Sequence, residues 1–132
     1  MRTELIVALG IGLAIAARSS SAHHSFAAEF DAAKPFELTG TVTKLVWSNP
    51  HAWIYFDVTD EKTKNVTSWA VELNSPNALL RAGWTRNSLK AGDVVTIEGS
   101  LAKDGSPTGN ARSVVTSTGQ RLFAGSSQTT TP

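Results

Sequence analysis

Three histidines are the residues of this chain whose types and positions best suit chemistry. His23 and His24 are adjacent, and His51 lies in the middle of the sequence. A histidine at the start of a mature protein offers a metal both its amine and an imidazole nitrogen, and a second imidazole from elsewhere completes a T-shaped site of three nitrogens. Nitrogen ligands in tetragonal geometry favour Cu(II). The histidines therefore form a candidate copper site, provided that the mature chain begins at His23.

The same histidines also have an interpretation without a metal. The adjacent pair would then belong to a solvated arm, and the ring of His51 would bond a backbone carbonyl and pack on Trp53. In the metal interpretation, His24 would replace one of the other ligands. Glu29 or Asp31 would then complete the shell or orient a histidine ring. The two interpretations differ in whether a free amino terminus is needed.

The start of the chain predicts export. Leu5 to Ala17 form an apolar run of thirteen residues. A helix needs about twenty residues to cross a bilayer, so this run is typical of a signal peptide. Ser20 and Ala22 fit a small-x-small cleavage site, which predicts a signal peptide at 1–22 and a mature chain that starts at His23 and has no membrane span. An uncleaved anchor is the alternative. The expected location is periplasmic or secreted.

Composition excludes several classes of protein. Without residues 1–22, the chain has ten basic and ten acidic residues, and this balance gives no support for nucleic-acid binding. There is no cysteine, and therefore no disulfide, thiol nucleophile or thiolate ligand. No phosphate loop, metalloprotease helix, catalytic-serine elbow or dinucleotide fingerprint occurs. Catalysis is left open, without candidate catalytic residues.

Alternating apolar residues predict a chain that is mostly β-structure. In the segment 51–60, Ile54 and Phe56 fall on one side. Trp53 and Tyr55 fall on the other, as in a strand with two different faces. The predicted strands are residues 35–47, 51–60, 66–74, 94–103 and 111–123.

A short helix of about two turns is predicted between the third and fourth strands. Pro76 fits its first turn and Gly83 fits its end, and Asn74 or Ser75 would cap it. Near the start of the chain, the spacing of Phe26 and Phe30 fits either one helical turn or an extended arm.

The order of these elements predicts the fold. Three strands, a helix and two further strands are the arrangement of a five-stranded OB-fold-like Greek-key barrel. A small β-sandwich is the alternative. The barrel domain would span 36–124, after an N-terminal arm at 23–35 and before a disordered tail at 125–132.

Glu72 alternates with the apolar residues of the third strand, so we expect it to face away from the core. Arg81 and Arg86 follow it at a distance that would allow an ion pair between the strand and the helix. We expect this pair to hold the helix on the barrel rather than to take part in a reaction.

An aromatic cluster around His51 gives a second candidate site. In OB-folds, ligands bind on strands two and three and the neighbouring loops, where aromatic rings stack on flat ligands. The alternative is that the rings fill the core of a small barrel. The candidate ligand-binding residues are Trp47, Asn49, Trp53, Tyr55 and Trp69.

Several stretches together resemble a known family. They include AHHSFAAEFD, NPHAW, SPNALLRAGW and GDVV, and the resemblance runs from Ala22 to about Ser126. The family consists of small exported bacterial proteins and is catalogued as a domain of unknown function. The resemblance implies an exported location and a small barrel-like β-fold, and it brings no established activity.

Taken together, the sequence predicts an exported binding or accessory protein of the cell envelope. The leading hypothesis is copper binding by His23 and His51, assisted by His24. The alternative is a module that binds a small molecule or a protein partner through the aromatic face, without a metal. We expect a monomer in either case.

Overall fold

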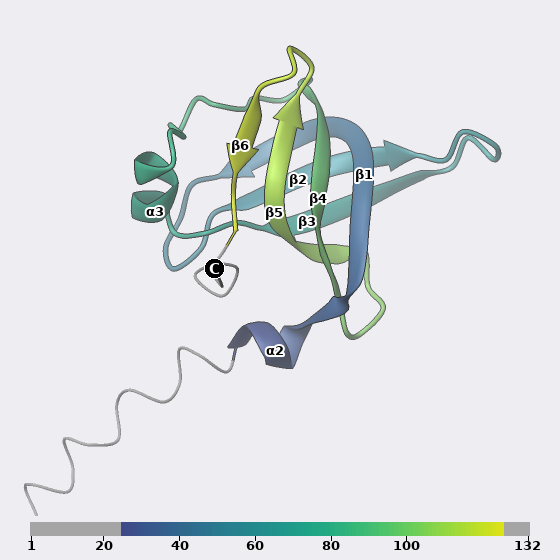
Figure 1. Ribbon diagram of the computed structural model, residues 1–132. Helices are drawn as coiled ribbons and strands as arrows, with labels where there is room; N and C mark the ends of the chain where they lie inside the picture. Colours follow the sequence, from purple (N-terminus) through teal and green to yellow (C-terminus); the bar gives the residue numbers. More distant parts are fainter. Residues whose placement is uncertain (1–24, 126–132) are drawn as a thin grey trace, which may run out of the picture.

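The computed structural model describes residues 25–125 of the chain (Figure 1). His23, His24, the predicted signal peptide with its cut after Ala22, and residues 126–132 of the predicted tail lie outside the described residues. The elements are α2 (Ser25–Glu29), β1 (Phe30–Val46), β2 (Trp53–Thr59), β3 (Val66–Glu72), α3 (Pro76–Arg81), β4 (Val94–Ala102), β5 (Thr108–Thr116) and β6 (Arg121–Phe123).

The strands form one ring-like sheet. Neighbouring strands follow the order β3-β2-β1-β4-β5-β6, and a further pairing joins β3 to β5. This last pairing is parallel, whereas all the others are antiparallel. The ring β1-β2-β3-β5-β4, with α3 between β3 and β4, confirms the predicted mostly-β fold and OB-fold-like order. A small sandwich is also compatible with this ring-like sheet.

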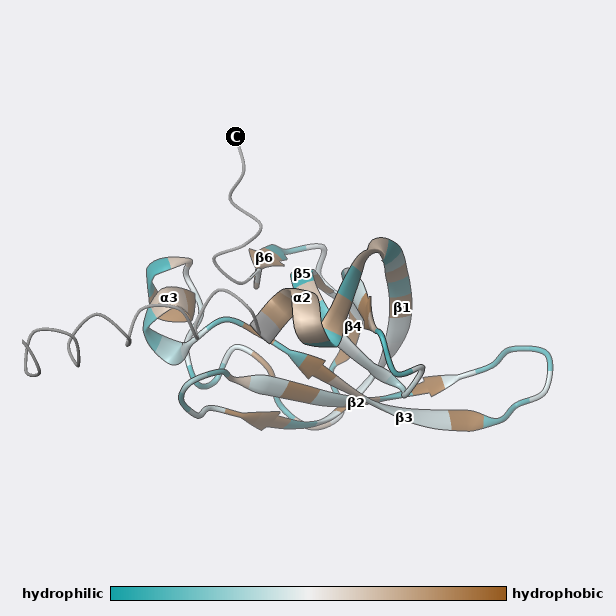
Figure 2. Cartoon of the chain, turned by 90° about the horizontal axis from the view of Figure 1, so that it is seen from below, coloured by the Kyte–Doolittle hydropathy of each residue, from teal (hydrophilic) through white to brown (hydrophobic). Residues whose placement is uncertain are grey.

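Strand alternation places the core inside the ring. Ile54 and Phe56 of β2 are fully buried, and so are Val71 of β3 and Ile97 of β4. Because successive side chains point to opposite faces, the intervening residues of β2 lie on the outer face. Beyond the ring, β2 and β3 continue as a projecting hairpin whose tip is hydrophilic (Figure 2).

Helix α3 follows the local signals in the sequence. The Ser75 side chain accepts a hydrogen bond from the backbone N–H of Ala78, and Pro76 occupies the first turn. Gly83 follows the helix at φ +96°, a conformation in which an L side chain would be strained. The predicted helix is confirmed in position and length.

Two predicted segments have different limits in the structure. The expected strand 111–123 is divided, because the chain turns back after Thr116 through Gly119, at φ +87°. Strand β6 then pairs with β5 as a sixth strand. Phe26 lies in the single turn of α2, 5.6 Å from the ring of Phe30. From Phe30 onward, the segment predicted as an arm forms the first part of β1 and pairs with β4.

Candidate functional site

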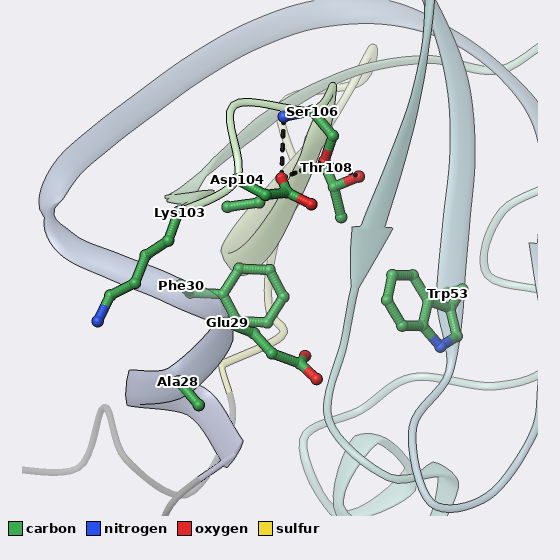
Figure 3. Close-up of a pocket in the computed structure, with 9 residues that line it drawn as sticks. Ala28, Glu29, Phe30, Trp53, Lys103, Asp104, Ser106 and Thr108 are labelled. Carbon is green, nitrogen blue, oxygen red and sulfur yellow. Dashed lines mark hydrogen bonds between the residues drawn. The ribbon is translucent and has the colours of Figure 1, made fainter.

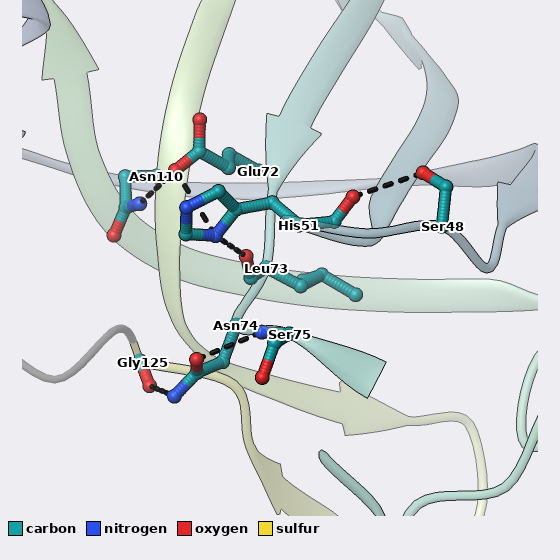
Figure 4. Close-up of polar contacts among 8 residues, drawn as sticks. All are labelled: Ser48, His51, Glu72, Leu73, Asn74, Ser75, Asn110 and Gly125. Atoms are coloured by element: carbon teal, nitrogen blue, oxygen red, sulfur yellow. Dashed lines mark hydrogen bonds and ion pairs between the residues drawn. The ribbon is translucent and has the colours of Figure 1, made fainter. Parts of the chain in front are cut away.

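His51 lies just before β2, and its ring orientation is fixed by the backbone. Its Nδ1 is 2.9 Å from the carbonyl oxygen of Leu73 (Figure 4). A carbonyl only accepts hydrogen bonds, so in the neutral ring Nδ1 carries the proton and Nε2 keeps its lone pair. The side chain is 32% exposed. A histidine held in this way presents Nε2 as a ready ligand for a metal or a hydrogen-bond donor.

Glu72 is the acidic neighbour of this histidine. Its Oε1 lies 3.5 Å from His51 Nδ1, and it accepts a hydrogen bond of 3.4 Å from Asn110 Nδ2. The Glu72 side chain is 12% exposed. Burial raises the pKa of this carboxyl; the charge of Glu29 raises it further, whereas His51 and the Asn110 hydrogen bond lower it. A positive charge next to the Glu72 carboxyl would therefore be favoured.

The predicted ion pair between Glu72 and an arginine is wrong. Among the described residues, neither Arg81 nor Arg86 forms an ion pair with Glu72. The neighbour of its carboxyl is instead the imidazole of His51, at 3.5 Å. The antiparallel register explains this, because Trp53 is directly opposite Glu72 and so brings His51, two residues before Trp53, alongside the end of β3. The expectation that Glu72 faces away from the core agrees with its position opposite Trp53.

A cleft of about 500 Å³ lies next to this histidine–glutamate pair (Figure 3). α2 and the start of β1 form one wall, the loop between β4 and β5 forms another, and Trp53 of β2 stands opposite. Its lining includes the side chains of Glu29, Phe30, Trp53, Lys103, Asp104 and Thr108. Trp53 is the cross-strand neighbour of Glu72, so the cleft and the pair are adjacent.

The predicted aromatic residues do not converge on one pocket. Trp53 and Tyr55 lie on the outer face of β2, where the Nζ of Lys44 sits 4.8 Å from the centre of the Tyr55 ring. Trp69 instead pairs with Phe56 on the core side. The structure therefore separates the tryptophan of β3 from the aromatic residues of β2 that were expected to join it.

The remaining members of that set have other surroundings. Trp47 is partly buried and packs against the core, as Trp69 does. The ring of Trp69 also stacks on Phe36, with centroids 5.9 Å apart. Asn49 is exposed in the loop before β2. Of the five predicted residues, Trp53 is the one that lines the cleft.

Within residues 25–125, no group of three or more His, Asp or Glu side chains is arranged to hold a metal ion. His51 is the only imidazole in this range. Further nitrogen ligands for a metal at His51 would therefore come from outside it, and His23 and His24 are the remaining histidines of the sequence.

Residues 11–112 match a family of unknown function (DUF6152). The chain belongs to this family. The resemblance inferred from the sequence motifs is thereby confirmed, and the matched range includes both candidate regions, the paired histidines and the segment around His51. No curated protein matches the chain. Between residues 25 and 125, none of the helices has the length and apolar character needed to cross a bilayer.

Proposed function

We propose that the protein is exported to the cell envelope and binds one copper ion there. In this proposal the signal peptide is cut after Ala22, His23 supplies its amine and its imidazole, and His51 supplies Nε2. His24 assists as a replacement ligand. The observation that carries the proposal is the hydrogen bond from His51 Nδ1 to the Leu73 carbonyl, because it fixes the ring and reserves Nε2 for a ligand.

The position of α2 supports the participation of the N-terminal histidines. The five residues Ser25–Glu29 form a short helix that is about 7.5 Å long. Two further residues reach at most about 7 Å beyond Ser25. Glu29 lies near enough to Glu72 for its charge to raise the pKa of that carboxyl. A chain that begins at His23 would therefore need only a short span from α2 to reach the His51–Glu72 pair.

The charges around His51 also favour a cation. Glu72 is largely buried beside the imidazole, and a metal at Nε2 would add positive charge close to it. Copper is the metal we propose, because an all-nitrogen ligand set in tetragonal geometry suits Cu(II) and the chain has no thiolate to favour another choice. Glu72 would act as a charged neighbour that stabilises the loaded state.

A copper titration of protein that begins at His23 tests the proposal. Competition with a chelator of known affinity should give one tight equivalent of Cu(II). His51→Ala should weaken binding by more than about a hundredfold, since loss of an outer-shell partner alone costs 10–100-fold. An alanine inserted before His23 should have a similar effect, because it removes the chelate of amine and imidazole.

Ser48→Ala is the matched control in the same loop. It removes the hydroxyl that donates to the His51 carbonyl, at 3.0 Å, and leaves the imidazole in place. This variant should bind copper as the parent does. Equal copper affinity in the parent and in His51→Ala would contradict the proposal.

A further inference from the structure

The cleft beside Trp53 carries an excess of negative charge. Glu29 and Asp104 both line it, and Figure 3 shows the Glu29 carboxylate turned from α2 toward the side where Trp53 stands. Among the described residues that line the cleft, Lys103 is the only positively charged one. Its ammonium donates a hydrogen bond to the carbonyl of Ala27 and points away from Trp53. The positive charge of Lys103 therefore serves to hold α2 in place.

Asp104 is held in its ionised form. Its Oδ1 accepts hydrogen bonds from the backbone N–H of Ser106, at 2.9 Å, and from the Ser106 hydroxyl, at 2.6 Å. These bonds lower the pKa of the Asp104 carboxyl. The Ser106 hydroxyl gives its one proton to Asp104, so it accepts a hydrogen bond from the Thr108 hydroxyl, whose Oγ1 is 3.0 Å away. One face of the cleft is therefore fixed, with an anion beside a threonine oxygen that can still accept a hydrogen bond from a ligand hydroxyl.

Trp53 supplies the surface that an organic cation would contact. It is partly exposed on the outer face of β2, and the side chain of Phe30 is nearly buried on the wall across from it. An indole ring is the best of the aromatic faces for attracting a cation. The cavity of about 500 Å³ also falls within the range of small-molecule sites.

We propose that this cleft binds a small organic cation, an ammonium group carried on an apolar or hydroxylated carbon frame. The ammonium lies between the Trp53 ring and the Glu29 carboxylate, and a hydroxyl on the frame meets Thr108. Such a ligand also offsets the repulsion between Glu29 and Glu72. The site uses none of the histidines proposed to bind copper and needs no metal.

Calorimetric titration of the metal-free full chain with choline chloride tests this inference. The comparison ligand is 3,3-dimethylbutan-1-ol, which has the same shape without the charge. Choline should bind at least about tenfold more tightly than this alcohol. Trp53→Leu should weaken choline binding about tenfold, whereas Trp53→Phe, which keeps a ring, should retain most of it. Glu29→Gln should also weaken binding.

Two control variants separate the cleft from its surroundings. Tyr55→Leu removes an aromatic ring from the same face of β2 but outside the cleft, and it should leave choline affinity unchanged. His51→Ala should also leave it unchanged, which keeps this test distinct from the copper proposal. Equal affinity for the neutral alcohol, or choline binding that persists in a folded Trp53→Leu variant, would overturn the inference.

Discussion

Replacement of Glu72 by glutamine should stabilise the fold at neutral pH. The Glu72 carboxyl is 12% exposed, and desolvation raises its pKa above the ordinary value. In the folded protein, the ionised carboxylate has lost more hydration free energy than its interactions with neighbouring residues restore. Glutamine has nearly the same shape, and its oxygen still accepts the hydrogen bond from Asn110. The substitution therefore removes the buried charge with little change in packing.

The pH dependence follows from the direction of the pKa shift. Because the pKa of Glu72 is raised on folding, its contribution to stability is fully present below the pKa of a glutamate in the unfolded chain, about 4.5. That contribution is lost as the pH rises through the folded pKa. We expect Glu72→Gln to be more stable than the parent at pH 7, by on the order of 1 kcal/mol, which is the usual size of the effect of one substitution.

Urea unfolding of the metal-free protein, followed by tryptophan fluorescence from pH 4 to pH 8, measures this difference. Glu61→Gln is the matched control, because Glu61 is exposed in the turn between β2 and β3. The free-energy difference between Glu72→Gln and the parent should grow as the pH rises, and the control should show no such trend. A Glu72→Gln variant that is less stable than the parent at pH 7, or a difference that does not vary with pH, would refute the reasoning.

Two further predictions concern the fold. Trp84 is 1% exposed, and its Nε1 donates to the carbonyl of Phe123 at 3.0 Å. Trp84→Phe should therefore lower the free energy of unfolding by about 2 kcal/mol, measured by urea unfolding followed by circular dichroism. An unchanged unfolding midpoint would contradict this. Backbone N–H groups of Thr63 and Lys62 lower the pKa of Asp60. Asp60→Asn should therefore destabilise the protein at pH 7, with a deficit in thermal unfolding that narrows as the pH falls below about 4; a deficit that stays constant with pH would rule out this cause.

Local patterns predicted the scaffold, because they depend on neighbours in the sequence. The alternation around Ile54 and Phe56 identified β2 and its buried face, and both side chains are fully buried. Ser75 and Pro76 marked the start of α3 in the same way. The division of the last predicted strand was missed, although Gly119 lay within the segment as a possible turn residue.

The arrangement of the candidate site depends on register, which the sequence did not define. Trp53 lies opposite Glu72, and this places His51 rather than an arginine of α3 beside the Glu72 carboxyl. Aligning segments 53–59 and 66–72 as an antiparallel hairpin would have predicted that His51 lies beside Glu72. The closing pair between β3 and β5 aligns Glu72 with Asn110, two residues far apart in sequence, and no local pattern predicts that contact.

Native mass spectrometry of the protein exported by its own signal tests the copper proposal most directly. The mass of the metal-free form identifies the first residue, and addition of one equivalent of Cu(II) reports whether copper is retained. We predict a chain that begins at His23 and keeps one copper ion, which the His51→Ala variant loses. A chain that begins at another residue, or one that sheds copper as readily as His51→Ala does, would contradict the proposal.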